Sequence, residues 1–160
     1  MRLGLLSFCI ITLLLLGGVS QARASDSATK EECVAKVADV VKLIQQKSAD
    51  EAIKQVNDSK GPYVWKDTYV YIMDLKGTIV AHGTQAKFVG KNLMGLKDPV
   101  TKEPWYPALF EKINASADSK GWFSYHWRKT ESEAIFKKEC YYERIGDLVV
   151  FAGIYGEKVE

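Results

Sequence analysis

Hydrophobic residues between positions 29 and 56 recur at steps of three and four, the spacing of one face of an α-helix. Thr29 and Glu32 form a capping box at the start of this stretch, because each side chain can accept a hydrogen bond from the other residue's backbone N–H. The pattern weakens at residues 47–50, and turn-forming residues at 57–62 interrupt it. We therefore expect one long helix over residues 29–56, with a kink near Ser48 left open.

The period changes after residue 67, where β-branched and aromatic residues predominate. Residues 68–74 and 78–82 predict a β-hairpin around a Leu-Lys-Gly turn. Residues 83–99 show no regular period, and residues 104–115 predict a short helix with a proline in its first turn.

Three further strands are expected at residues 121–128, 135–145 and 148–155, the last two joined by a tight turn at Gly146-Asp147. Five strands joined mostly as hairpins give an antiparallel sheet, so the fold class is α+β. The long helix covers one face of the sheet, and the irregular segment with the short helix forms a lid over the other. This arrangement predicts one cavity for a small molecule.

The N-terminus has the pattern of a secretory signal: Arg2, an apolar run over residues 3–19, and Ala22-Arg23-Ala24. We expect cleavage after Ala24, which leaves residues 25–160 as one exported domain, periplasmic or secreted. The alternative is a retained anchor, but the apolar run is at the lower limit of a membrane span.

Charge narrows the classes of partner. Lys and Arg number 22 against 20 Asp and Glu, and two arginines leave with the signal, so the exported domain is formally neutral. Nucleic acid is not expected as a partner, because its recognition needs a clustered basic field.

Cys33 and Cys140 are the two cysteines that remain after cleavage. In an oxidising compartment such a pair predicts a disulfide, and closing so long a loop is worth roughly 4 to 5 kcal/mol. The alternative is two buried thiols. The two histidines show no metal-ligand spacing, so neither a metal nor another cofactor is expected.

Four strings in order resemble a single Cache domain of type 2: YVYIMDLKGTIVAH, FVGKNLMGLKDP, GWFSYHWRK and KKECYYERIGDLVVFAGIY. The resemblance implies an extracytoplasmic, PAS-like sensor fold that binds small molecules, often short organic acids, as the input module of chemoreceptors and kinases. This chain shows no second membrane span and no output module, so a membrane receptor or kinase partner would have to receive the signal.

Aromatic residues are the main candidates for the wall of the cavity. Tyr69 and Tyr71 share one strand face, as do Tyr125 and Trp127, and Trp105 and Tyr106 start the lid helix. Ordinary sheet packing is the alternative for both strand pairs.

Two basic residues complete the predicted ligand site. His82 can donate to a carboxylate or sense pH, or can instead satisfy a backbone group. Lys138 matches a lysine of the Cache pattern and would neutralise a carboxylate. If Cys140 faces the helix, however, strict alternation places Lys138 on the helix side and favours Lys137 instead. Asp98 before Pro99 predicts a turn.

Three hypotheses of function follow. The first is a non-enzymatic binding module for a short organic acid or similar metabolite that signals through a partner. The second is an interaction or dimerisation module, a homodimer joined through the long helix, that modulates a membrane receptor. The third is a small hydrolase-type enzyme, which the absence of a nucleophile motif disfavours.

Overall fold

Two helices open the computed structural model, which describes residues 26–129, 132 and 134–159. α1 spans Lys30–Gln46 and α2 spans Ala49–Val56. The capping box is confirmed, with Thr29 Oγ1 3.2 Å from the Glu32 N and the Glu32 carboxylate 2.9 Å from the Thr29 N. The expected single helix is wrong: Lys47 leaves the helical conformation, and Ser48 caps α2 by accepting from the Glu51 N–H. The predicted signal segment lies outside the described residues.

The sheet is antiparallel throughout. Its strands follow the order β1-β2-β6-β5-β4, and β3 also pairs with β2. The bounds are β1 Val64–Trp65, β2 Thr68–Asp74, β3 Ile79–His82, β4 Lys120–Arg128, β5 Ile135–Ile145 and β6 Leu148–Lys158. The α+β class is confirmed with six strands instead of five. The additional strand, β1, has only two residues, too few to show a period.

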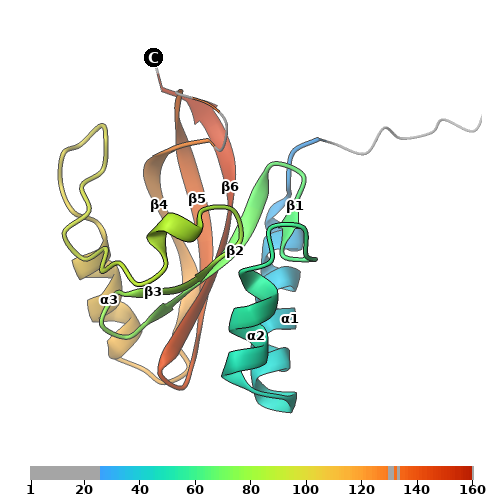
Figure 1. Cartoon of the computed structure of the whole chain (residues 1–160). Helices are drawn as coiled ribbons and strands as arrows, with labels where there is room; N and C mark the ends of the chain where they lie inside the picture. The colour runs from blue at the N-terminus through green and yellow to red at the C-terminus, as the bar shows by residue number, and fades with distance from the viewer. Residues whose placement is uncertain (1–25, 130–131, 133, 160) are drawn as a thin grey trace, which may run out of the picture.

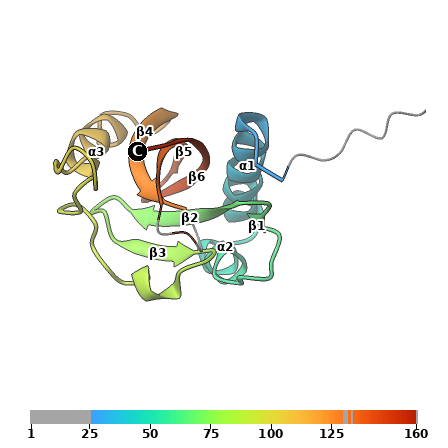
Figure 2. The ribbon, with the colours of Figure 1, turned by 90° about the horizontal axis from the view of Figure 1, so that it is seen from above.

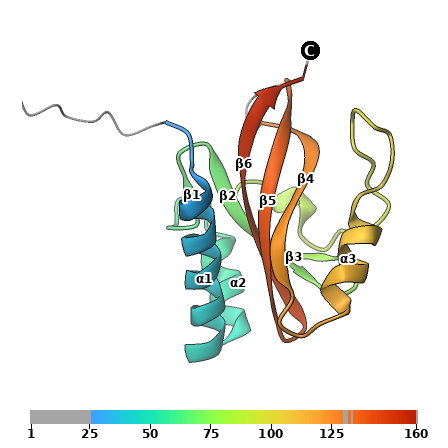
Figure 3. The same cartoon turned by 180° about the vertical axis from the view of Figure 1, so that it is seen from behind.

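Each face of the sheet carries its own hydrophobic core. Figures 1 and 3 show α1 and α2 on one side of the strands and the third helix, α3 (Tyr106–Asn114), on the other. On the helix face, Cys33, Val37 and Val40 of α1 pack on strand residues. These strand residues are Val70, Ile72, Ala81, Tyr141, Val150 and Ala152. On the lid face, α3 packs on the alternate positions Tyr69, Tyr71, Met73, Tyr125, Cys140, Tyr142, Val149 and Phe151.

The lid, which we define as residues 83–105, contains the short 3₁₀ helix η1 (Ala86–Phe88) and leads into α3 (Tyr106–Asn114). Figure 2 shows η1 and α3 at opposite ends of it. Backbone bonds hold its first half to the β2–β3 hairpin: the Leu93 N–H donates to the Gly77 carbonyl at 2.9 Å, and the Gly90 N–H to the Ile79 carbonyl at 2.8 Å. The lid is therefore fixed over one face of the sheet. No helix in the described part of the chain is both long and apolar enough to cross a bilayer.

Candidate functional site

A narrow cavity lies between the lid and the sheet. Its volume of about 20 Å³ holds roughly one water molecule. Seven of the eight predicted ligand residues line it: Tyr69, Tyr71, His82, Trp105, Tyr106, Tyr125 and Trp127. Sequence reasoning missed its apolar wall, formed by Ile79, Phe88, Leu93 and Leu96. Three of these four lie in the lid, where no period identifies them.

Tyrosines from β2 and α3 meet at the inner end of the cavity. Tyr71 stacks on Phe151 with ring centroids 4.7 Å apart. The Tyr106 hydroxyl donates to the Tyr71 hydroxyl at 3.4 Å, and the Cys140 thiol lies 3.7 Å from the Tyr71 oxygen. Burial raises the pKa of Tyr71 and Tyr106, so both phenols are neutral hydrogen-bonding groups.

His82, at the end of β3, has a fixed tautomer. Its Nδ1 accepts the backbone N–H groups of Thr84 and Gln85 at 3.3 and 3.1 Å, so the ring proton is on Nε2. Burial first, and then the nearby charge of Lys138, lower the pKa of His82 to about 3. The His82 ring is therefore neutral, and it satisfies two backbone N–H groups, as one of the two expected roles required.

Lys138 on β5 is completely buried, with a solvent-exposed fraction of 0%. Its ammonium nitrogen lies 4.2 Å from the ring centroid of Tyr69, 4.6 Å from that of Tyr155, and 3.4 Å from the Tyr155 hydroxyl. Burial opposes its charge, but Tyr69, Tyr155 and Cys140 raise the pKa of Lys138 above its usual value. Among the described residues this ammonium has no carboxylate partner. Lys138 lies behind the Tyr69 ring and is the one predicted ligand residue that does not line the cavity.

The face predicted for Cys140 is wrong, and the predicted disulfide is not formed. Cys33 and Cys140 are both free and buried. Tyr141 faces α1, so its neighbour Cys140 points to the lid side, into the other core. The alternation rule was correct, and it therefore brings Lys138 to the lid face together with Cys140. Lys137 is exposed.

Trp105 closes the outer side of the cavity. Its indole stacks on Tyr125 with centroids 4.7 Å apart and an interplanar angle of 13°. The indole N–H is buried and has no acceptor among the described residues. Since an unsatisfied buried donor is costly, this group is suited to a ligand acceptor.

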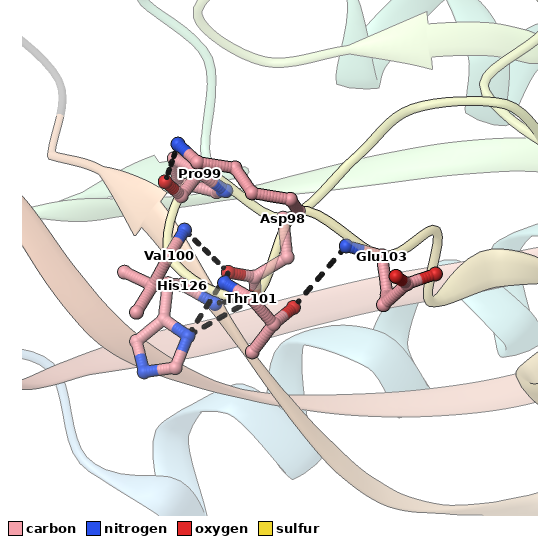
Figure 4. Close-up of polar contacts among 7 residues, drawn as sticks. Asp98, Pro99, Val100, Thr101, Glu103 and His126 are labelled. Atoms are coloured by element: carbon pink, nitrogen blue, oxygen red, sulfur yellow. Dashed lines mark hydrogen bonds and ion pairs between the residues drawn. The ribbon is translucent and has the colours of Figure 1, made fainter.

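Asp98 anchors the lid to β4, as Figure 4 shows. Its carboxylate accepts the backbone N–H groups of Val100 at 2.8 Å, Thr101 at 3.0 Å and His126 at 2.7 Å. The His126 ring Nδ1 lies 3.1 Å from both carboxylate oxygens. The predicted turn is present, whereas no local pattern predicted the link to His126. This link holds the segment before Trp105 against the sheet.

Comparison with known proteins agrees with this architecture. The family model described as a Cache domain matches residues 34–160. The chain belongs to the Cache domain family. The predicted single Cache domain of type 2 is thereby confirmed, and such domains are extracytoplasmic sensor domains. No curated protein sequence matches the chain.

Three solved structures share the fold of this Cache domain. A periplasmic sensor domain of a chemotaxis protein is 22% identical, with a TM-score of 0.60, covering 79% of this chain and 90% of the other. A Cache chemosensory domain described for carboxylic acid recognition is 18% identical, with a TM-score of 0.60 and coverages of 79% and 88%. A methyl-accepting chemotaxis protein from Vibrio parahaemolyticus is 23% identical, with a TM-score of 0.62 and coverages of 79% and 87%.

The described part of this Cache domain contains no group of three or more His, Cys, Asp or Glu side chains that could hold a metal ion. The cavity wall combines aromatic rings with the His82 imidazole, and the Lys138 ammonium lies behind it.

Proposed function

We propose that this Cache domain is a periplasmic or secreted sensor module that binds a short organic acid as its carboxylate. The observation that carries the proposal is an excess of donors at one cavity: His82 and Trp105 line it, the Trp105 indole N–H has no acceptor among the described residues, and the Lys138 ammonium lies behind the Tyr69 ring of its wall. All eleven lining residues are described, and none of them has a carboxylate. An anionic ligand would accept hydrogen bonds from these donors and neutralise the ammonium charge.

Size limits the ligand. A cavity of about 20 Å³ admits a molecule of a few heavy atoms only if the lid moves outward by a small amount. The apolar wall of Ile79, Leu93 and Leu96 suits a short aliphatic tail. The solved Cache domain described for carboxylic acid recognition supports the same class.

A thermal-shift screen tests the proposal. Acetate, propionate and lactate are compared with the neutral isosteres acetamide, propanamide and lactamide. An anion present at a hundred times its dissociation constant adds about 2.7 kcal/mol to the free energy of unfolding. We expect this gain for at least one anion and for none of the amides.

Lys138→Met and Lys137→Met form a matched pair, since the two lysines are adjacent but only Lys138 is buried. We expect Lys138→Met to abolish the gain and to retain the fold, because an apolar side chain of similar length replaces a buried ammonium that has no carboxylate partner among the described residues. Lys137→Met should behave as the unaltered protein. Equal responses of the two variants, or no response to any anion, would refute the proposal.

The proposed signalling step requires a partner, either a membrane receptor or kinase or a second copy of the chain. Trp122 on β4 and Val34 on α1 support a contact surface, because their exposed fractions of 38% and 37% are large for apolar side chains. Light scattering with and without propionate tests the homodimer, and a molecular mass that stays monomeric in both would leave the receptor or kinase as the partner. An enzymatic function is not part of the proposal, since the similar structures are sensor domains.

A further inference from the structure

We infer that the anion reaches the cavity through the cleft beside Tyr69, with Lys129 as an outer electrostatic guide; this inference rests on the proposed function. The cleft, here the Lys129 cleft, has a volume of about 450 Å³. It is lined by Ser59, Val64, Lys66, Asp67, Thr68, Tyr69, Thr84 and Lys129. Among the described lining residues, Tyr69 is the one that this cleft shares with the cavity. Rotation of a single ring would therefore join the two spaces.

Positive groups follow one another from the cleft toward the cavity. The Lys129 ammonium lies 5.8 Å from the ring centroid of Tyr155, and the Lys138 ammonium lies 4.6 Å from the same centroid. Lys138 in turn lies 4.2 Å from the Tyr69 ring. An anion in the cleft thus meets Lys129 before the buried Lys138. Fields of this kind raise the association rate of an oppositely charged ligand.

Asp67 holds the outer lysine in place. Its carboxylate lies 2.8 Å from the Lys129 ammonium and also accepts the Ala28 backbone N–H at 2.8 Å. Lys66 on the same wall lies 2.6 Å from the Glu32 carboxylate, so each ammonium group of the cleft has one carboxylate partner and the described groups carry no net negative charge. The Thr84 hydroxyl, also on this wall, is buried without a partner among the described residues and can donate to a passing anion.

A second cleft, the Asp98 cleft, adjoins the cavity on the other side of Trp105 and has a volume of about 190 Å³. Its described wall carries two carboxylates, Asp98 and Glu103, and one ammonium group, that of Lys137. The stacked Trp105 and Tyr125 rings separate it from the cavity, and the Asp98–His126 link holds the lid there. Charge and anchoring both favour the Lys129 cleft as the entrance.

Obstruction of each cleft tests the inference. Ser59→Cys and Ser124→Cys each place a thiol on an exposed serine, one in the Lys129 cleft and one in the Asp98 cleft. Both variants are labelled with a bulky maleimide. The native thiols should not react in the folded protein, since both are fully buried and burial raises the pKa of Cys33 to about 12 and of Cys140 to about 11.

Stopped-flow tryptophan fluorescence with acetate, propionate and lactate gives association and dissociation rates. We expect the label at position 59 to slow both rates by roughly tenfold or more and to leave the dissociation constant unchanged, because an obstructed entrance affects only the transition between free and bound states. The label at position 124 should leave both rates within about twofold. A distorted binding site would change the dissociation constant instead.

Substitutions that remove one lysine charge provide a second test of the entrance. Lys129→Gln should slow association severalfold at low ionic strength and lose this effect at high salt, whereas Lys137→Gln should not. Three outcomes would refute the Lys129 cleft as the entrance while leaving the binding function intact. In the first, only the label at position 124 slows association; in the second, neither label slows it; in the third, Lys137→Gln slows it. If none of the three anions binds the unlabelled protein, the proposed function fails and the entrance with it.

Discussion

Replacing Asp98 by alanine should cost the fold about 3 kcal/mol. The carboxylate accepts three backbone N–H groups, and its residue is only 4% exposed, so water cannot easily replace it. Each lost bond is worth about 1 kcal/mol. The contact to the His126 ring adds to the loss. Urea denaturation measures the free energy of unfolding.

The exposed carboxylate of Asp118 provides the control, and Asp118→Ala should change stability by less than about 0.5 kcal/mol. A loss below about 1 kcal/mol for Asp98→Ala would refute the reasoning, because it would mean that the lid is held by other contacts.

The pH dependence of this loss has a definite sign. Burial acts to raise the pKa of Asp98, but the N–H groups of His126, Thr101 and Val100 lower it below its ordinary value of 3.8. A carboxyl group with a lowered pKa stabilises the fold above its unfolded pKa, and this stabilisation disappears as the pH falls through the folded pKa. The difference between Asp98→Ala and the unaltered protein should therefore be constant from pH 7 to about 5 and shrink below about pH 4.

Three other predictions concern the sheet, His82 and the cysteines. In Gly153→Ala the added Cβ would lie 2.6 Å from a backbone oxygen of β5, so denaturation should show a loss of roughly 1–3 kcal/mol; Gly121→Ala, with its nearest atom at 3.6 Å, should show little loss. His82 has a lowered pKa of about 3 against 6.5, so stability should fall by about 1.4 kcal/mol per pH unit below pH 6.5, and His82→Phe should lack this slope. Mass spectrometry after alkylation in denaturant without reductant should find Cys33 and Cys140 both modified; unmodified cysteines joined by a bridge would contradict the structure.

The sequence allowed the strand pattern to be predicted because the relevant signals are local. β5 has its predicted bounds, and alternation correctly placed Tyr69 with Tyr71 and Tyr125 with Trp127. The face of Cys140 was predicted from an assumed disulfide, which is not a local signal, and one wrong pairing reversed the side assigned to Lys138. Alternation fixes which residues share a face but not which face is covered by which element.

The lid shows the other limit. The contacts between Asp98 and His126 join positions 28 residues apart, and Leu93 and Leu96 follow no period. Side-chain placement in such a segment is decided by tertiary packing.

The two cores of the sheet share one backbone. Tyr71 forms part of the cavity wall, while its neighbours Val70 and Ile72 lie in the opposite core, which they share with α1 and α2. Close-packed interiors transmit strain, since they leave no free volume to absorb it. A ligand that displaces Tyr71 would shift the peptide units on either side of it, and the adjacent Val70 and Ile72 side chains lie in the core of the helix layer. β2 would thereby couple the cavity to the helix layer through side chains that are adjacent in the sequence.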